Sequence, residues 1–350
     1  MTLTSKDYSA IREELDECTR PIYFFGDDSD GLCSFLLLYR YKREGRGVCV
    51  KAKPKLDSKF LNVVEDYQPD KAFILDVPLL DQDFVDAAKI PMVWIDHHPP
   101  IEVRKVKYFN PRKDAPQENI CTTHLCYNVV KDTRPQDIWI AMLGIVGDWQ
   151  LPADLAAEFS EKYPDLLSPD VKRPEEALFD TPLGKLVRFY NFILNGKTQD
   201  VNQTVKILTR IDDPYEIINR SSARARLIGK RFDSINTQYE ALLNEAVASV
   251  RKDDPVLLFT YTEDKMSFTG PLANELLYRY PKKIIVIARK RSGEMKCSLR
   301  SAGKVHIAPM VDKALIGVDG HGGGHEHACG ASIKEEHFDK FVAQLRAQIG

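Results

Sequence analysis

The segment PMVWIDHHPP at residues 91–100 joins a short apolar run to three adjacent polar residues, Asp96, His97 and His98. A short apolar run that stops at prolines is typical of a buried strand in a parallel sheet. Three polar groups at the end of such a strand are costly to bury unless a metal ion or a phosphate uses them. A helix cap followed by two surface imidazoles is the structural alternative. We therefore expect a strand that ends at a ligand site.

Two earlier strands also end on carboxylates. PIYFFG at residues 21–26 runs towards Asp28 and Asp30, and KAFIL at residues 71–75 runs into Asp76. Helical patterns separate these strands, which is the order expected of βαβ units. Right-handed crossovers place the carboxyl ends of parallel strands at one edge of the sheet. We therefore expect these carboxylates to converge with the Asp-His-His triad.

The rest of the chain divides into a helical stretch and a second α/β segment. Residues 119–250 are largely helical in pattern, and strand patterns return at residues 256–262, 283–290 and 295–301. We therefore expect an α/β protein of two domains, in which a helical linker joins an N-terminal parallel-sheet domain to a smaller C-terminal α/β domain. The expected boundaries are 1–165 for the first domain, 166–253 for the helical extension and linker, and 254–350 for the second domain.

The polar residues after the strands are typical ligands of a hard metal ion. Asp28 and Asp30 lie two residues apart directly after a strand, although aspartates are also common in turns and helix caps. Asp76 ends the next strand, and Asp148 follows an apolar helical run, where a lone aspartate can equally face solvent. Carboxylates combined with His97 suit manganese, magnesium or iron better than a structural zinc site, which favours cysteine.

A glycine-rich segment near the C-terminus, GHGGGHEH from residue 320, predicts a phosphate-binding loop. The backbone N–H groups of Gly323 and Gly324 can approach an anion closely, and His325 can donate to it. Ser298 and Arg300, on the strand just upstream, are expected phosphate partners, arginine through its bidentate fork. A flexible turn for the glycines and a surface position for Arg300 are the alternatives.

Charge and cysteine content narrow the class of protein. Nine lysines and arginines lie between Arg279 and Lys304 with a single acid, Glu294, which suits a phosphate backbone or else a solvated surface. The net charge of −2 excludes a uniformly basic nucleic-acid binder. The seven cysteines form no Cys-x-x-Cys pair and are interpreted as reduced thiols. Without a secretory signal or an apolar run long enough to cross a bilayer, we expect a cytoplasmic protein with no membrane partner.

The order of these motifs resembles the DHH phosphoesterase family with its associated C-terminal domain, across nearly the whole chain. The chain is most similar to the RecJ-like and nanoRNase-like branches, whose second domain carries a GGGH segment. The resemblance implies a centre of two Mn²⁺ ions, with Mg²⁺ or another divalent cation as the alternative. It assigns the residues as follows: Asp76 bridges the ions, Asp28 belongs to one ion, Asp30, His97 and Asp148 complete the other, and Asp96 and His98 support them.

The sequence departs from the family pattern before the first motif. Many members place a further histidine or aspartate two or four residues before the first motif aspartate, where this chain has Gly26 and Phe24. Three explanations stay open. Asp27 substitutes from the neighbouring position, the first ion binds only with substrate phosphate, or catalysis is weak.

The resemblance implies a manganese-dependent phosphodiesterase or exonuclease that acts on single-stranded DNA or RNA or on short oligonucleotides. Asp76, Asp96, His97 and His98 are then the expected catalytic residues. A phosphoesterase of small molecules, such as cyclic or linear dinucleotides or a nucleoside bisphosphate, is the first alternative. A replication-complex scaffold with a decayed metal site is the second. A homodimer is also left open.

Overall fold

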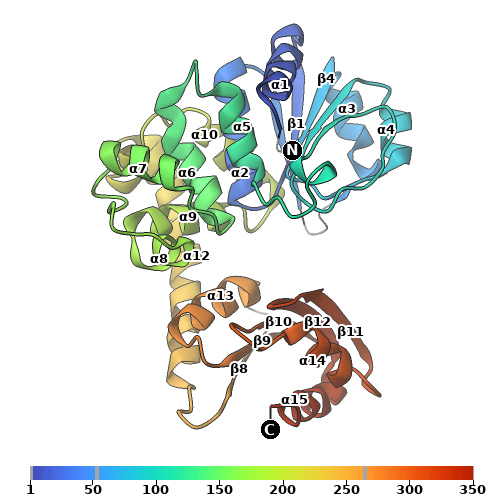
Figure 1. Cartoon of the computed structure of the whole chain (residues 1–350), viewed down its shortest axis with the longest axis vertical. Coiled ribbons are helices and arrows are strands. Elements are labelled where there is room, and N and C mark those ends of the chain that lie inside the picture. Colours follow the sequence, from blue (N-terminus) through green and yellow to red (C-terminus); the bar gives the residue numbers. More distant parts are fainter. Residues whose placement is uncertain (1–2, 52–54, 263–265, 350) are drawn as a thin grey trace. The chain divides into compact units, whose positions relative to one another are not determined.

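A computed structural model describes residues 3–51, 55–262 and 266–349. The chain forms two compact units, Met1–Phe232 and Asp233–Gly350. Each unit contains one five-stranded sheet (Figure 1). The expected fold class, an N-terminal parallel sheet and a smaller C-terminal α/β domain, is confirmed. The three-part division at residues 165 and 253 stays a prediction.

The sheet of the first unit is parallel throughout. Its strands lie in the order β2 (Arg46–Val50), β1 (Pro21–Gly26), β4 (Lys71–Leu75), β6 (Met92–Ile95) and β7 (Lys107–Phe109). The three central strands are buried along their whole length, as expected of a sheet with helices on both faces. The polar residues that follow β1, β4 and β6 therefore meet at the carboxyl edge of the sheet.

Side-chain alternation divides the strand residues between two cores. Tyr23 and Phe25 of β1 belong to one core, and Phe24 belongs to the other. The first core contains residues of α1 (Ser5–Glu17), α2 (Ser29–Lys42), α5 (Thr122–Val130) and α6 (Ile138–Gly147). The second contains residues of α3 (Leu61–Tyr67), α4 (Gln82–Ala88) and the short parallel pair β3 (Lys55–Leu56) and β5 (Leu79–Leu80).

A helical extension packs against α2 and α6 within the first unit. It consists of α7 (Ala153–Lys162), α8 (Pro174–Asp180), α9 (Pro182–Ile193), α10 (Thr198–Leu208) and α11 (Pro214–Ile218). The long helix α12 (Ala223–Ala248) begins in the first unit and ends in the second. Single 3-10 turns occur at Ser58–Phe60, Pro111–Lys113, Pro135–Asp137 and Glu335–His337. In the described part of the chain, no helix combines the length and apolar character that a bilayer crossing requires.

The sheet of the second unit is mixed. Its order is β11 (Gly320–His325), β12 (Ala328–Lys334), β10 (Glu294–Arg300), β9 (Ile284–Arg291) and β8 (Val256–Tyr261), and only β8 and β9 are parallel. Helix α13 (Thr269–Arg279) packs on β9 and β10. Helices α14 (Ile307–Ala314) and α15 (Phe338–Arg346) share a core with Cys297 and Leu299, whose side chains leave β10 on the face opposite Ser298 and Arg300.

The glycine-rich segment is a strand rather than the expected loop. Gly320–His325 forms β11, the exposed edge strand, hydrogen-bonded along its length to β12. Glycine has low strand propensity, so these residues carry no local strand signal, and the pairing with β12 supplies the order instead. Close approach also requires small residues here, because a Cβ at Gly322 would lie 2.9 Å from the Cβ of Ala331.

Candidate active site

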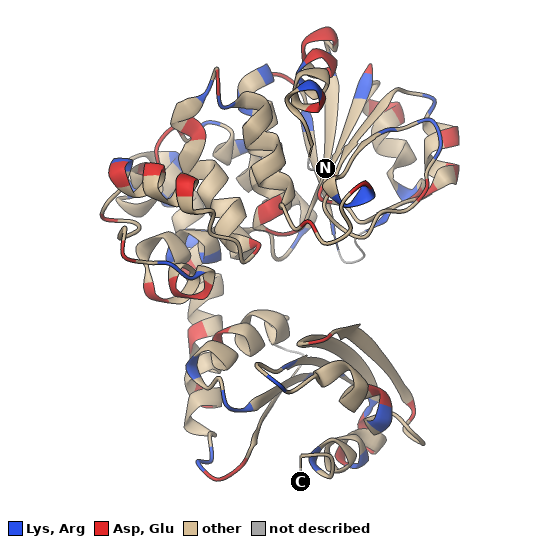
Figure 2. Cartoon of the chain, in the orientation of Figure 1, with Lys and Arg blue, Asp and Glu red and all other residues tan. Residues whose placement is uncertain are grey.

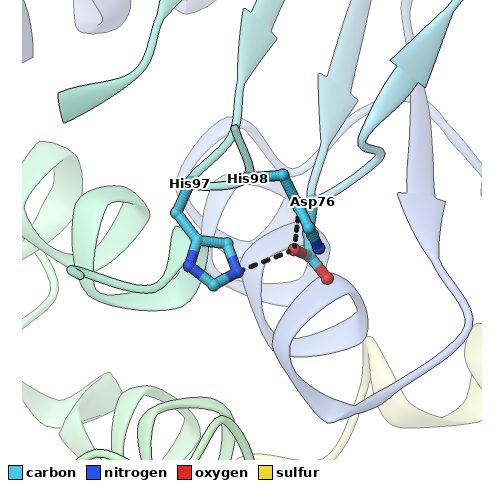
Figure 3. Close-up of side chains that lie close together, drawn as sticks. All are labelled: Asp76, His97 and His98. Carbon is cyan, nitrogen blue, oxygen red and sulfur yellow. Dashed lines mark ion pairs between the residues drawn. The ribbon is translucent and has the colours of Figure 1, made fainter. Parts of the chain in front are cut away.

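Two groups of potential metal ligands meet at the carboxyl edge of the parallel sheet, and His97 belongs to both. One group is Asp76, His97 and His98, and the other is Asp30, His97 and Asp148. Within each group the ligand atoms lie within 4.8 Å of one another. Nε2 of His97 lies 3.5 Å from Oδ1 of Asp76, and Nδ1 of His98 lies 3.8 Å from the same oxygen (Figure 3). Asp76 therefore faces both imidazoles.

Asp76 occupies a strained backbone position directly after β4. Its φ of +55° is left-handed, a region that few residues other than glycine adopt, although aspartate tolerates it better than most. Its backbone N–H donates to the carbonyl of Ile95 at 3.1 Å, which fixes the turn against β6. Strain of this kind persists where the surrounding structure holds it and is concentrated at functional sites.

Asp30, in the first turn of α2, is held by the start of another helix. The backbone N–H groups of Thr122 and Thr123 donate to its two carboxylate oxygens at 3.0 and 2.7 Å. The hydroxyl of Thr123 also donates to the backbone carbonyl of Asp30 at 2.8 Å. These contacts use the free N–H groups and the positive dipole end of α5, which stabilise a carboxylate in its charged form.

Asp96 is fully buried and orients His98. Its Oδ1 lies 2.8 Å from Nδ1 of His98, and its Oδ2 accepts the backbone N–H of His98 at 3.1 Å. Burial acts to lower the pKa of His98, but the hydrogen bond and the charge of Asp96 outweigh it, so that pKa is raised. Asn110 closes the turn, because its amide donates to the carbonyl of His98 at 3.0 Å and to the hydroxyl of Tyr108 at 2.7 Å.

Asp28 belongs to neither ligand group of the described residues, but it lies beside them and its carboxyl group forms a hydrogen bond with that of Asp76. It is the exposed N-cap of α2, and its Oδ1 accepts the backbone N–H of Gly31 at 2.9 Å. Burial of its carboxyl group, and then repulsion from Asp30, raise the pKa of Asp28 to about 6, although the hydrogen bonds with Gly31 and Asp76 oppose this rise. The residue thus has a capping role, and its role as a ligand stays a prediction.

The charge balance of the cluster fits divalent cations. Burial, followed by repulsion from Asp30 and Asp28, raises the pKa of Asp76 well above its usual range and that of Asp148 to about 9. Burial lowers the pKa of His97, which favours the neutral, ligating imidazole. Nδ1 of His97 is buried with no hydrogen-bond partner in the described residues. Crowded acids beside an unpartnered imidazole nitrogen form a donor set of the kind that a hard divalent cation stabilises.

Gly26 and Phe24, where the family pattern places a further ligand, supply no ligand side chain to the cluster. Phe24 is fully buried in the core on the α3 and α4 side of the sheet. A Cβ at Gly26 would lie 2.5 Å from the backbone oxygen and 2.9 Å from Oδ2 of Asp76. The close approach of Asp76 therefore requires glycine at this position.

The five expected substrate-binding residues lie together on the sheet of the second unit. Gly330 of β12 lies between Ser298 of β10 and Gly323 of β11. In the same way, Ala328 of β12 lies between Arg300 of β10 and His325 of β11. Strand periodicity places Ser298, Arg300, Gly323 and His325 on the same face of the sheet. Gly324 alternates to the other face.

Arg300 and Ser298 are positioned by α13. Nε of Arg300 donates to Oδ1 of Asn274 at 2.7 Å, and the hydroxyl of Ser298 donates to that of Thr269 at 3.0 Å. Small residues, Gly330 and Ala328, separate these side chains from β11, so the surface between them is flat. Their role in binding stays a prediction.

Much of the basic segment is engaged in contacts within the second unit. Arg279 faces Glu275, Lys290 faces Glu335 and Lys296 faces Glu294. Lys283 donates to backbone carbonyls, including that of Arg251 at 2.8 Å. Acidic and basic stretches alternate along both units (Figure 2). The segment is therefore less free to follow a phosphate backbone than its composition indicates.

Arg112 is a site residue that the sequence patterns did not identify. It follows β7 at the same edge of the sheet, and its Nε donates to the carbonyl of Glu118 at 3.0 Å. Its charge adds to burial in lowering the pKa of His97 and partly opposes the rise that burial causes in the pKa of Asp148. No carboxylate of the described residues forms an ion pair with it. A short, weakly patterned strand such as β7 gives little sequence signal, so its terminal arginine was not assigned to the edge.

Two family models match the sequence. The DHH family, N-terminal domain, matches residues 21–147, and the DHHA1 domain matches residues 254–350. No curated protein matches the chain.

Several solved structures share the fold. RecJ from Thermus thermophilus in complex with Mn²⁺ has 15% identity and a TM-score of 0.65 over 98% of this chain, which spans 54% of that protein. Exonuclease RecJ bound to manganese has 14% identity and a TM-score of 0.64, covering 99% of this chain and 95% of that one. The pGpG-specific phosphodiesterase of Vibrio cholerae has 13% identity and a TM-score of 0.53, covering 95% and 99%. These identities establish the fold alone.

Proposed function

Because the chain belongs to the DHH phosphoesterase family, with a DHH N-terminal domain and a DHHA1 domain, we propose that it is a metal-dependent phosphodiesterase that hydrolyses single-stranded or short nucleic acids. The observation that carries this proposal is the pair of ligand groups that share His97. Crowded carboxylates with raised pKa values, an unpartnered imidazole nitrogen and a strained Asp76 lie at the edge where open α/β sheets bind ligands.

The donor set suits two divalent cations, manganese first and magnesium as the alternative. Asp30, His97 and Asp148 would hold one ion. Asp76, together with Asp28, would hold a second ion, to which Gly26 and Phe24 add no ligand. When bound, such ions activate a water near neutral pH and stabilise negative charge on the attacked phosphate.

His98 is the proposed proton donor. Asp96 holds its Nδ1, while its Nε2 forms no hydrogen bond with the described residues. The hydrogen bond to Asp96 supports the protonated imidazole, so Nε2 can give a proton to the leaving oxygen. Asp96 acts as a positioning residue, because it fixes the imidazole and supports its charge.

The second unit supplies the proposed phosphate-binding surface. Nε and Nη1 of Arg300 donate to Asn274 and to backbone carbonyls, so its Nη2 is the donor that would bind phosphate. Ser298 and His325 lie on the same face of the sheet. The exposed N–H groups of an edge strand made of glycine and histidine can add further donors. Together they would hold a phosphate group of the substrate.

A dinucleotide phosphodiesterase is the second candidate function. It is favoured by the ion pairs that occupy Arg279, Lys290 and Lys296, since these lysines and arginines would otherwise follow a long backbone. Both candidates use the same metal ligands and differ in the length of substrate that they accept.

Asp76→Asn tests the proposal, because asparagine keeps the size of the side chain and tolerates a left-handed φ. We expect manganese-dependent hydrolysis of a short single-stranded oligonucleotide to fall by about a thousandfold or more. Calorimetry should show the loss of manganese binding in parallel. Wild-type turnover by this variant would refute the assignment. Wild-type protein that binds neither manganese nor substrate would favour the scaffold.

A further inference from the structure

Trp149 is exposed to solvent and is adjacent in sequence to a candidate metal ligand. Of the three tryptophans in the chain, Trp94 and Trp139 are buried in the core, whereas Trp149 is 42% exposed. It directly follows Asp148 at the end of α6. Consecutive Cα atoms are about 3.8 Å apart, so the indole is attached to the backbone one residue from a candidate metal ligand.

The turn that carries Trp149 is a Schellman motif. The N–H of Trp149 donates to the carbonyl of Val146, and that of Gln150 donates to the carbonyl of Ile145, both at 3.0 Å. The residue at the position of Trp149 in this motif adopts a left-handed φ and is usually glycine. Trp149 has a φ of +59°. The chain therefore has a bulky aromatic side chain where glycine would be less strained.

The same turn is fixed to the ligand cluster. Nε2 of Gln150 donates to Oδ2 of Asp148 at 2.8 Å, and its Oε1 accepts the N–H of Cys121 at 3.2 Å. Cys121 is the N-cap of α5, the helix whose first N–H groups hold Asp30. The contacts that orient the Asp148 carboxylate thus also fix the backbone from which the indole extends.

The indole is only partly covered by neighbouring side chains. Its ring contacts Phe179 of α8 at a centroid distance of 5.7 Å and an interplanar angle of 64°, which is an edge contact rather than a stack. Such a contact occupies at most one face of the indole, and no other aromatic ring of the described residues pairs with it. An exposed, rigidly placed indole is suited to stacking on a planar ligand.

We propose that Trp149 stacks on the base of the nucleotide whose phosphate binds at the cation site to which Asp148 contributes, and so selects nucleotides over other phosphoesters. This inference rests on the proposed phosphodiesterase function and names its substrate class. Stacking accepts any base, because every base has a π face. Trp149 would therefore confer a requirement for a base without a preference for sequence.

The test compares AMP with ribose 5-phosphate, which lacks the base. Both are titrated in the presence of Mg²⁺ into wild type, Trp149→Phe and Trp149→Gly, with calorimetry and tryptophan fluorescence as readouts. Glycine suits the left-handed turn, so this variant should fold, and Trp149→Phe keeps a stacking ring. We expect AMP to quench wild-type fluorescence and to bind Trp149→Gly about ten- to a hundredfold more weakly, with Trp149→Phe in between. Ribose 5-phosphate should bind all three proteins equally.

Unchanged AMP affinity in Trp149→Gly would overturn the inference, as would an equal loss for ribose 5-phosphate. If Trp149→Gly differs from wild type in molar mass but not in AMP affinity, the inference is also overturned, and the indole is assigned to an interface between copies of the chain. Manganese-dependent hydrolysis of a dinucleotide separates this inference from the proposed function. Turnover with the same KM in wild type and Trp149→Gly would contradict the stacking role and leave the phosphodiesterase function supported. Base-dependent binding without turnover supports stacking and contradicts the phosphodiesterase.

Discussion

Asp76 combines costs that a purely structural residue would avoid. It is buried, its φ is left-handed and its neighbours are carboxylates that raise its pKa. Each of these lowers the stability of the metal-free protein, and a bound cation would offset the repulsion among the acids. The position is therefore explained by the chemistry of the site rather than by folding.

Asp96→Asn should separate the orientation of His98 from its charge. Asparagine can still accept a hydrogen bond, but it no longer supports a protonated imidazole, so the pKa of His98 should fall. We expect kcat to decrease about ten- to a hundredfold and the alkaline limb of the pH profile to move to lower pH. A uniform loss of activity with an unmoved alkaline limb would argue against His98 as the proton donor.

At the scale of elements, β1 and β4 approach so closely that Gly26 has room for no side chain. Gly26→Ala should push the backbone of Asp76 away, which lowers stability by about 1–3 kcal/mol. It should also weaken manganese binding at least about tenfold. Urea unfolding and calorimetry measure the two effects. Gly270→Ala in α13 is the matched control, since no atom lies within 4 Å of its added Cβ. Equal behaviour of the two variants would contradict the packing argument.

The edge of the first sheet opposite the site holds a buried ion cluster. Glu14 of α1 accepts from Lys71 of β4 and from Lys107 of β7. Burial acts to raise the pKa of Glu14, but hydrogen bonds from the two lysines outweigh it, and the pKa is lowered. The stability that this group contributes is therefore present above the unfolded pKa, about 4.5, and is lost as the pH falls below it.

Glu14→Gln should reduce the free energy of unfolding at pH 7 by about 1–3 kcal/mol, because the buried Lys71 is left with only the more distant Glu17, at 3.9 Å, as a counter-charge. The difference from wild type should narrow as the pH falls from 7 to 4. Urea denaturation at both values measures it, and hydrolysis at pH 7 should be unaffected. A difference that is the same at pH 4 and pH 7 would show that the charge of Glu14 is not what stabilises the fold.

Sequence patterns predicted the strands whose residues are buried on both faces of the sheet. PIYFFG, KAFIL and the strand before Asp96 are continuous apolar runs, so β1, β4 and β6 and the convergence of their terminal acids could be predicted. Backbone contacts between distant segments could not be predicted, such as the hydrogen bonds from the first N–H groups of α5 to Asp30. The edge strand β11 was missed because glycine carries no strand signal, and Arg112 was missed because β7 is only three residues long.

At the scale of the whole molecule, the metal ligands and the proposed phosphate-binding residues belong to different units. Arg300→Ala should therefore raise KM for a short oligonucleotide about tenfold while kcat changes little. Arg291→Ala is the control, as an exposed arginine at the end of the neighbouring strand β9. Steady-state kinetics with a melting curve for each variant measures the effect. A loss confined to kcat would assign Arg300 to the chemical step instead.

The most direct test of the proposed phosphodiesterase is hydrolysis of end-labelled single-stranded DNA and RNA, from dinucleotides to about 25 nucleotides, with manganese and with a chelator. We predict metal-dependent release of nucleotides by wild type and none by Asp76→Asn. Cleavage of long strands would support the exonuclease, and cleavage confined to the shortest substrates would support the dinucleotide phosphodiesterase. Absence of metal-dependent turnover at every length would contradict the account.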